Sequence, residues 1–328
     1  MAHGPRRAFS DDLERFDLRV CLPLLAVHAG CLLALATGTS PTALAACAAL
    51  FALRAFGLTA GYHRYFAHRA YRTSRAFQLA LAWLGACAAQ LGPLWWAAHH
   101  RLHHRHSDTV QDVHSPHAGS LWWAHLGWLV CRKHSATRLD AIADFAAYRE
   151  LRFLDRWHAL APLSLVALLF ASGEALRAHA PGLDTSGMQL VGWGFFVSTT
   201  VLYHVTFAVN SLGHRFGSRR FETRDRSRNN ALLALLTLGD GWHNNHHAHP
   251  GLARHGLRGW ELDATWLGLR GLAALGLVWD LREPGGRARP LVEPRRHSGD
   301  PAARGRRSAT PAATATAHAS PKRSPTRA

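Results

Sequence analysis

Histidines gathered in four short segments constrain this chain more than any other feature of its sequence. The segments read HRYFAH, HRLHH, NSLGH and HNNHH. Their nine imidazoles belong to His63, His68, His100, His103, His104, His214, His243, His246 and His247. Neutral imidazole is the commonest metal ligand in proteins, and a first-row metal ion takes only about four to six ligands. Nine imidazoles therefore suffice for two ions, provided that the fold brings these distant segments together.

The spacing within each segment indicates how the imidazoles can be shared. In an HxxHH helix, positions i, i+3 and i+4 share one face, whereas adjacent positions diverge by about 100°. His103 and His104 can therefore point to different ions, and HNNHH repeats the pattern. His63 and His68 lie roughly 140° apart around an ideal α-helix. They can serve one ion only if the helix ends or distorts between them.

Asn210 lies four residues before His214, so both side chains project from one helix face. Its amide can bind an ion directly or hold a bound water. The box HRLHH selects His100, and the remaining histidines, including the neighbouring His99, are expected to be structural. No cysteine lies in any segment, which disfavours an iron–sulfur cluster or a common structural zinc site. A histidine-rich metal pair without thiolates suggests oxygen chemistry at iron.

Four apolar stretches are long enough to cross a bilayer, which takes about 20 helical residues. They cover residues 20–37, 42–60, 157–176 and 188–209. Only a short turn at Ser40 separates the first two, so they form a hairpin. Arg54, near the end of the second, is expected to snorkel towards the interface. The net charge of +17 fits the basic loops of a membrane protein, and the apolar spans exclude a nucleic-acid binder.

A fifth apolar stretch, residues 76–98, is also long enough to span. The first histidine segment precedes it and the second follows it. A single crossing would put these two segments on opposite sides of the bilayer, where they could not share a metal site. We therefore expect residues 76–98 to form a helix lying in or near the interface.

Basic residues in short loops mark the cytoplasmic side. The connection between the second and third spans is rich in arginine, whereas the hairpin turn is uncharged. We expect both termini and all histidine segments on the cytoplasmic side. The predicted fold is an all-α integral membrane protein, with four transmembrane helices and a cytoplasmic helical cap that carries a dimetal site. Residues 1–19 form an N-terminal segment, residues 20–283 the membrane domain, and residues 284–328 a disordered basic tail.

Over roughly residues 20–283 the chain resembles the membrane fatty-acyl desaturases of the acyl-CoA (stearoyl-CoA, Δ9) type. The resemblance rests on the three histidine boxes in order, on NSLGH between the second and third, and on GLTAGYHRYFAHRAY and NNALLALLTLGDGWHNNHH. It implies that the nine histidines hold two irons at the cytoplasmic mouth of the bundle, and that Asn210 reaches one of them through water. It also implies a set of residues that contact the acyl chain or its headgroup: Gln90, Trp96, Thr206, Arg132 and Lys133.

The resemblance implies an oxygen-dependent enzyme that inserts a cis Δ9 double bond into a saturated acyl-CoA. Because no redox domain is visible, electrons must come from a separate ferredoxin, flavoprotein reductase or cytochrome. The protein is expected to lie in a lipid bilayer. The Ala- and Arg-rich composition fits a bacterial source, so we expect this bilayer to be a bacterial cytoplasmic membrane. Ala98 and His99 stand where animal members carry an Arg-Asp pair that contacts the coenzyme A headgroup. A phospholipid or acyl-carrier-protein ester therefore stays open as the carrier. Asp240 stands where the family often has Glu.

Two other classes share some of these features. A related diiron membrane hydroxylase acting on fatty acids or alkanes also has histidine boxes, with different spacing around the second and third. A membrane metal transporter is the other class, but transporters usually place their ligands near the midplane of the bilayer. In this chain the ligands follow the ends of the spans.

Overall fold

The computed structural model describes residues 16–285, apart from the side chain of Arg19. Within that range the chain is helical, except for loops and one short sheet in which β1 (Arg72–Thr73) pairs antiparallel with β2 (Val278–Trp279). The predicted basic tail lies almost wholly outside the described residues, as does most of the predicted N-terminal segment.

Four helical segments of the described chain are long and apolar enough to cross a membrane, which confirms the predicted all-α fold with four spans. They run over Val20–Thr37, Pro41–Ala67, Leu160–His179 and Pro181–Ser211. The elements that form them are α1 (Leu18–Gly30), α2 (Leu32–Thr37), α3 (Pro41–Phe56), the π-helix η2 (Gly57–Ala67), α9 (Leu160–His179), η6 (Pro181–Leu183), α10 (Gly187–Leu190), the π-helix η7 (Val191–Val197) and α11 (Ser198–Ser211).

The hairpin turn between the first two spans is fixed by Ser40. Its hydroxyl accepts a hydrogen bond from the backbone N–H of Ala43, and Pro41 occupies the first turn of α3. Serine at the N-cap and proline just inside the helix are the preferred start of an α-helix. The Ser40 hydroxyl also donates to Gln189 at 2.8 Å, which ties the turn to the start of the fourth span.

The second span continues to Ala67, beyond the predicted end at Ala60. Its last part is η2, in which backbone bonds run to the fifth residue back instead of the fourth. It packs closely on α4 (Arg75–Ala86), because a Cβ added at Gly57 would lie 2.9 Å from the backbone nitrogen of Gly85. His63 therefore lies on the helix of the second span, past the end at Ala60 that the sequence predicted.

The prediction of one helix over residues 76–98 is wrong, because the chain there forms two. α4 ends at Ala86, and α5 (Pro93–His106) begins after a tight connection. Ala89 and Leu91 adopt positive φ in that connection, and Pro93 opens α5. Neither helix reaches the length of about 20 residues that a span needs.

The prediction that Arg54 snorkels is also wrong, because its side chain is fully buried. The guanidinium donates to the hydroxyls of Ser198 and Thr199 and to the carbonyls of Gly194 and Cys87. The fourth span therefore supplies the polar contacts that the interface would otherwise provide, and Arg54 stays inside the bundle.

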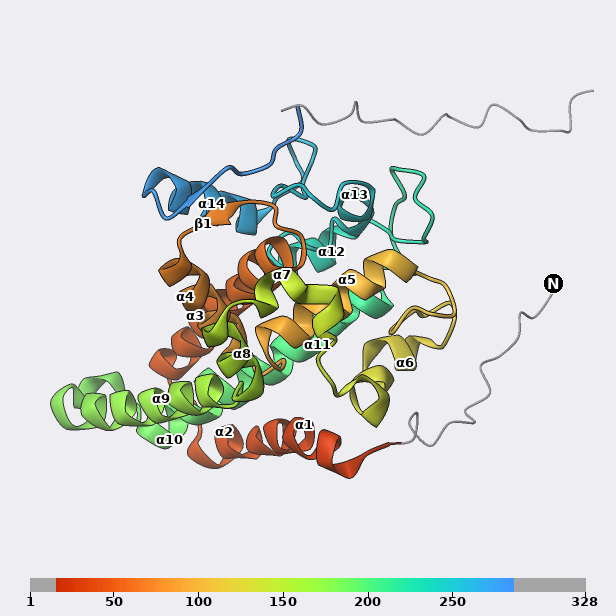
Figure 1. Ribbon diagram of the computed structural model, residues 1–328. Helices are drawn as coiled ribbons and strands as arrows, with labels where there is room; N and C mark the ends of the chain where they lie inside the picture. Colours follow the sequence, from red (N-terminus) through yellow and green to blue (C-terminus); the bar gives the residue numbers. More distant parts are fainter. Residues whose placement is uncertain (1–15, 286–328) are drawn as a thin grey trace, which may run out of the picture. The chain divides into compact units, whose positions relative to one another are not determined.

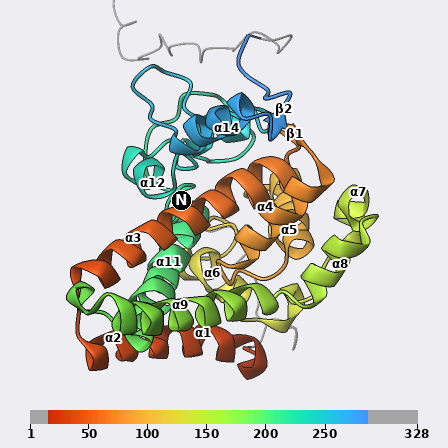
Figure 2. The ribbon, with the colours of Figure 1, turned by 90° about the vertical axis from the view of Figure 1, so that its left-hand side faces the viewer.

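Short helices cover one end of the spans. Figure 2 shows α12 (Ala231–Leu236), α14 (Ala264–Ala274) and the two strands grouped there, with α1, α2 and α9 at the opposite side of the view. Figure 1 shows α13 (His243–Ala248) beside α12, and α5 running between the cap and α11. Between α5 and α9 the chain forms a further series of short helices: α6 (Leu121–His125), η3 (Gly127–Leu129), η4 (Arg132–His134), η5 (Leu139–Ile142), α7 (Ala143–Ala146) and α8 (Arg149–Arg156).

Candidate metal centre

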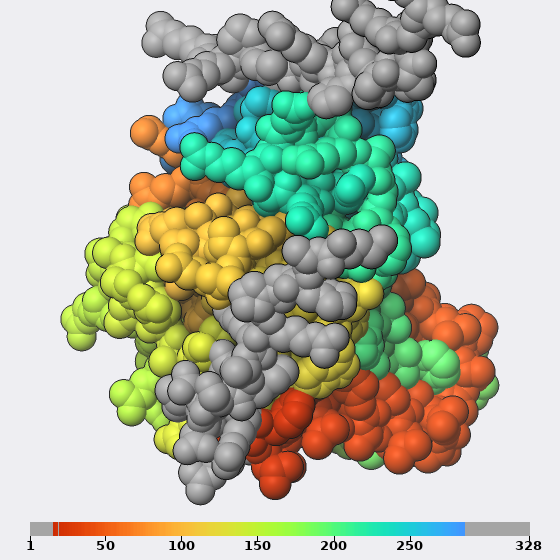
Figure 3. Space-filling view, turned by 90° about the vertical axis from the view of Figure 1, so that its right-hand side faces the viewer, coloured from red at the N-terminus to blue at the C-terminus, as the bar shows by residue number. Residues whose placement is uncertain are grey.

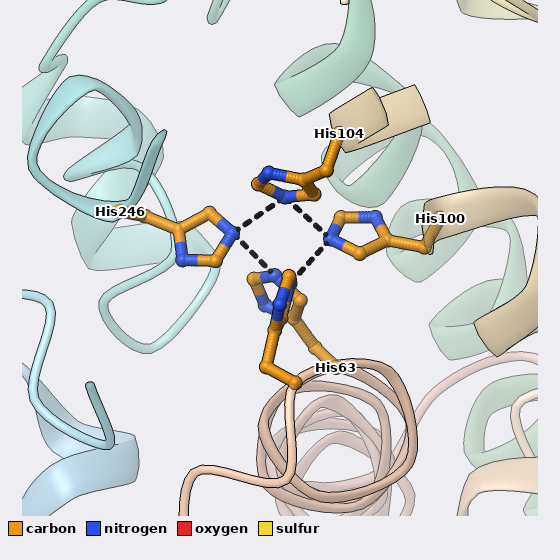
Figure 4. A group of neighbouring side chains, drawn as sticks. His63, His100, His104 and His246 are labelled. Atoms are coloured by element: carbon orange, nitrogen blue, oxygen red, sulfur yellow. Dashed lines mark hydrogen bonds between the residues drawn. The ribbon is translucent and has the colours of Figure 1, made fainter. Parts of the chain in front are cut away.

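Five of the nine predicted ligands form one group, with their ligand nitrogens all within 4.8 Å of one another. They come from the end of the second span, from α5 and from α13: His63, His68, His100, His104 and His246. The four nearest contacts join Nε2 atoms at 2.9 to 3.0 Å. Figure 4 shows the labelled rings turning these nitrogens towards a common centre.

The other four predicted ligands, His103, His214, His243 and His247, form a second group. The Nε2 atoms of His214 and His243 are 2.9 Å apart. The Nε2 atoms of His103 and His247 are buried without a hydrogen-bond partner among the described residues.

The two groups adjoin. The ring of His104 in the first stacks on that of His247 in the second, with centroids 4.3 Å apart. Adjacent histidines of each HxxHH box therefore go to different groups, as expected from the angle of about 100° between neighbouring helix positions.

Four carboxylates of the described chain fix the orientation of four rings by contacting Nδ1. The pairs are His63–Asp240 at 2.7 Å, and His103–Asp112, His214–Asp108 and His247–Asp225 at 2.9 Å. An ionised carboxylate only accepts hydrogen bonds, so Nδ1 carries the proton and Nε2 keeps its lone pair. Metal-binding histidines are usually held in this way.

Burial favours the neutral, ligating form of most of these imidazoles. Loss of water, followed by the neighbouring imidazoles, holds the pKa well below its usual range in His68, His100, His104, His243, His246 and His247. Burial also acts to lower the pKa of His103, but the Asp112 carboxylate outweighs it and the pKa is raised.

The donor set fits a pair of transition-metal ions. Two nitrogens bound at about 2.1 Å and at right angles on one ion lie about 3.0 Å apart, which matches the spacing in the first group. In the second group, leaving buried nitrogens without a partner costs about 1–3 kcal/mol each. A bound ion removes that cost. The histidine clusters therefore suggest a metal site of two adjoining parts.

An apolar cavity that is partly open to solvent reaches the metal groups. Its wall includes side chains from η2, α5 and α11, and three of its lining residues belong to the metal groups: His63, His100 and His243. The remaining lining residues are Ala55, Leu58, Thr59, Trp96, Leu202, Val205, Thr206, Val209, Asn210, Leu236, Thr237 and Asp240. A pocket of this kind suits a long hydrocarbon chain held beside metal ions.

Comparison with known proteins identifies the family. Residues 39–272 match the family model described as fatty acid desaturase, and a "sn-1 stearoyl-lipid 9-desaturase" of Anabaena variabilis is 38% identical over 69% of this chain and 78% of its own length. The chain belongs to the fatty acid desaturase family. An "Acyl-CoA C20 Delta5-desaturase" of Anemone leveillei is 36% identical over 73% of each chain. A "Delta-9 acyl-lipid desaturase 1" of Arabidopsis thaliana is 32% identical over 87% of this chain and 89% of its own. The predicted family is confirmed, and the chain is an oxidoreductase of lipid metabolism.

The predicted substrate contacts of this desaturase lie in two regions. Trp96 and Thr206 line the cavity; Trp96 stacks on His100 with centroids 5.0 Å apart, and Gln90 donates to Thr206 at 3.2 Å. Arg132 and Lys133 lie exposed on η4, and they are not among the described residues that line the cavity.

Sequence reasoning missed two histidines near the metal groups. His255 contacts Asp240 at 3.1 Å, and its ring lies 4.5 Å from that of His246. His114 stacks on His103 with centroids 4.2 Å apart. Neither belongs to a box, so spacing gave no signal for them. His99, which the box spacing left out, belongs to neither the five-histidine nor the four-histidine group, and its Nδ1 contacts the Trp95 carbonyl at 2.9 Å.

Proposed function

We propose that this desaturase is oxygen-dependent and that its two histidine groups hold two iron ions. The observation that carries the proposal is the meeting of nine imidazoles, four of them oriented by carboxylates, with an apolar cavity. Methylene C–H bonds are too strong for a side-chain base, so bound iron supplies the oxygen chemistry that removes two hydrogens. The chain's own residues supply position and exclusion of water.

Each histidine group binds one ion in this proposal. Asn210, which lines the same cavity as His243, holds a water at one of them. The apolar wall, including Leu58 and Leu202, keeps bulk water from the reacting methylenes. The hydrogen bond between Gln90 and Thr206 fixes one side of the cavity. The acyl chain therefore has a defined position relative to the histidines.

The proposed product carries a cis Δ9 double bond, and the proposed substrate is a saturated acyl-CoA. Arg132 and Lys133 serve as charge-assisted donors to its phosphates. An acyl-lipid is the second candidate substrate, favoured by the names of the relatives from Anabaena variabilis and Arabidopsis thaliana.

We place both termini and the metal centre on the cytoplasmic side of a bacterial membrane. Electrons come from an external carrier. Labelling of single cysteines introduced at Thr39, an exposed residue of the hairpin turn, and at Arg132 tests this topology. The account expects the two positions on opposite sides of the membrane, and labelling from the same side contradicts it.

Expression in a host that lacks desaturase activity tests the reaction. Gas chromatography of its lipids should show a new cis monounsaturated fatty acid with the wild-type chain and none with His104→Ala. A hydroxylated product would assign the chain to the hydroxylases. Metal uptake without any oxidised lipid would favour a metal-binding or transport role.

A further inference from the structure

An arginine-rich loop, residues 215–228, follows His214 and lies next to the four-histidine group. It lies beside α13 and beyond the end of α11 in Figure 1, and Figure 3 shows it in green-blue on the surface. Four of its arginines are exposed: Arg215, Arg219, Arg224 and Arg226. No carboxylate of the described residues forms an ion pair with these four guanidinium groups. The loop's two acids are the exposed Glu222 and the buried Asp225, so its surface is strongly positive.

Two hydrogen-bonded routes connect this surface with metal-group histidines. In the first, the carboxylate of Asp225 accepts from Nδ1 of His247 at 2.9 Å. In the second, the backbone N–H of Arg226 donates to the carboxylate of Asp108 at 2.7 Å, and the same oxygen contacts Nδ1 of His214 at 2.9 Å. The exposed loop is thus one or two hydrogen bonds from two of the four imidazoles in this group.

A third route joins the positive charge of Arg226 to His214 through the ring of His117. The guanidinium of Arg226 donates to Nδ1 of His117 at 3.2 Å. The other ring nitrogen of His117 then carries the proton and donates to the carbonyl of His214 at 2.8 Å. An anionic partner attracted to Arg226 would therefore approach within one imidazole ring of a metal-group residue.

The chemistry of the loop fits a protein partner better than a small anion. Phe216 is 53% exposed between these arginines, and aromatic and arginine side chains are the types enriched in protein interfaces. The residues proposed for substrate phosphates, Arg132 and Lys133, lie on a different element, η4. The loop is therefore available for a second partner.

We propose that residues 215–228 form the docking surface for an acidic, one-electron carrier protein that delivers electrons at the four-histidine group. This inference rests on the proposed function. Each encounter oxidises the carrier by one electron. Two encounters supply the two electrons that, with two protons and the two substrate hydrogens, reduce dioxygen to two waters. Charge complementarity of this kind steers association and makes it dependent on salt.

Binding of a redox-inert carrier to the full chain in lipid nanodiscs tests the proposal. The probe is an acidic plant-type ferredoxin in which gallium replaces iron, with the dissociation constant measured at low and at high salt. The test variant is Arg215→Gln with Arg224→Gln, and the matched control is Arg258→Gln with Arg270→Gln. The control changes the net charge equally at two exposed arginines of other segments.

The loop variant should weaken carrier binding roughly tenfold at low salt and flatten its salt dependence, because two complementary charges are lost. The control should change the constant less than about twofold. Equal weakening in both variants, or none in the loop variant, would overturn the docking surface. A raised KM for the acyl substrate with unchanged carrier affinity would overturn it too, by assigning the loop to a phosphate headgroup. The gallium carrier transfers no electron, so its binding can be measured whether or not the wild type makes a desaturated product. Absence of a desaturated product would contradict the proposed function but not the docking surface.

Discussion

The backbone N–H of His68 donates to the carbonyl of His63, five residues back, at 3.2 Å. On an α-helix these two side chains would diverge by roughly 140°. The wider π-helical turn, together with the end of the helix at Ala67, instead puts their ring centroids 5.0 Å apart. π-helical turns are rare and occur often at functional sites. In this chain the turn is what lets both histidines serve one group.

The partition of nine histidines into two groups predicts selective metal loss. His104→Ala removes a ligand of the five-histidine group, and His247→Ala removes one of the four-histidine group. Each variant should lose most of one ion while retaining most of the other, because the second group keeps its ligands. Inductively coupled plasma mass spectrometry of purified, iron-loaded protein measures the metal, and circular dichroism checks the fold. Full metal content and full desaturation in both variants would sink the dimetal account.

The carboxylate behind His247 should set metal affinity without touching the metal. Asp225→Asn keeps the size of the side chain but removes the charged acceptor from Nδ1 of His247. Such changes typically cost about 10–100-fold in metal affinity. Competition with a chelator measures the loss, which should be confined to one of the two ions. Glu222→Gln is the matched control, because Glu222 is an exposed acid of the same loop. Similar chelator sensitivity of both variants would contradict the role given to Asp225.

The sequence predicted the helical fold, the four spans and the family, because apolar length and box spacing are local properties. It could not predict that Arg54 is buried, because the hydroxyl acceptors of Ser198 and Thr199 come from a span far along the chain. The sequence did hold a signal for the break within residues 76–98, because Gly92-Pro93 is a turn dipeptide that the prediction of one helix overlooked. The positive φ of Ala89 and Leu91, in contrast, has no sign in the sequence.

The residues that orient the metal-group histidines could not be predicted from the sequence either. Asp108 and Asp112 follow the second box closely, and this proximity was the one signal available for them. Asp225 reaches His247 from a loop without any motif, and His255 reaches Asp240 from another. Contacts of this kind depend on how the loops pack, which residue spacing does not encode.

The buried guanidinium of Arg54 predicts a stability effect in the fourth span. Thr199→Val removes a hydroxyl acceptor of Arg54 while nearly preserving shape. Leaving a buried charged donor short of a partner costs about 1–3 kcal/mol, so the free energy of unfolding should fall by that amount. Thermal unfolding in detergent measures it. Thr200→Val is the control, because the hydrogen bond that the described residues give the Thr200 side chain is to the weakly bonding thiol of Cys31. Equal stability of Thr199→Val and the wild type would refute this interpretation.

If Arg132 and Lys133 bind the headgroup of acyl-CoA, their loss should affect KM and kcat unequally. Arg132→Ala with Lys133→Ala should raise KM for acyl-CoA more than it lowers kcat, because these residues meet the carrier and not the reacting carbons. Steady-state assays with purified enzyme measure both constants. Desaturation of intact phospholipid, with acyl-CoA left unchanged, would reject the acyl-CoA assignment and leave the metal chemistry standing.

The most direct test of the central claim is product formation by purified, reconstituted protein with and without iron. Metal-free protein, reloaded with iron and supplied with dioxygen, a reduced electron carrier and a saturated acyl substrate, is assayed by mass spectrometry of the products. The account predicts a cis Δ9 monounsaturated product that appears only after iron loading, consumes oxygen, and is absent in His104→Ala and His247→Ala. Equal product formation by the metal-free protein, or by both histidine variants, would contradict it.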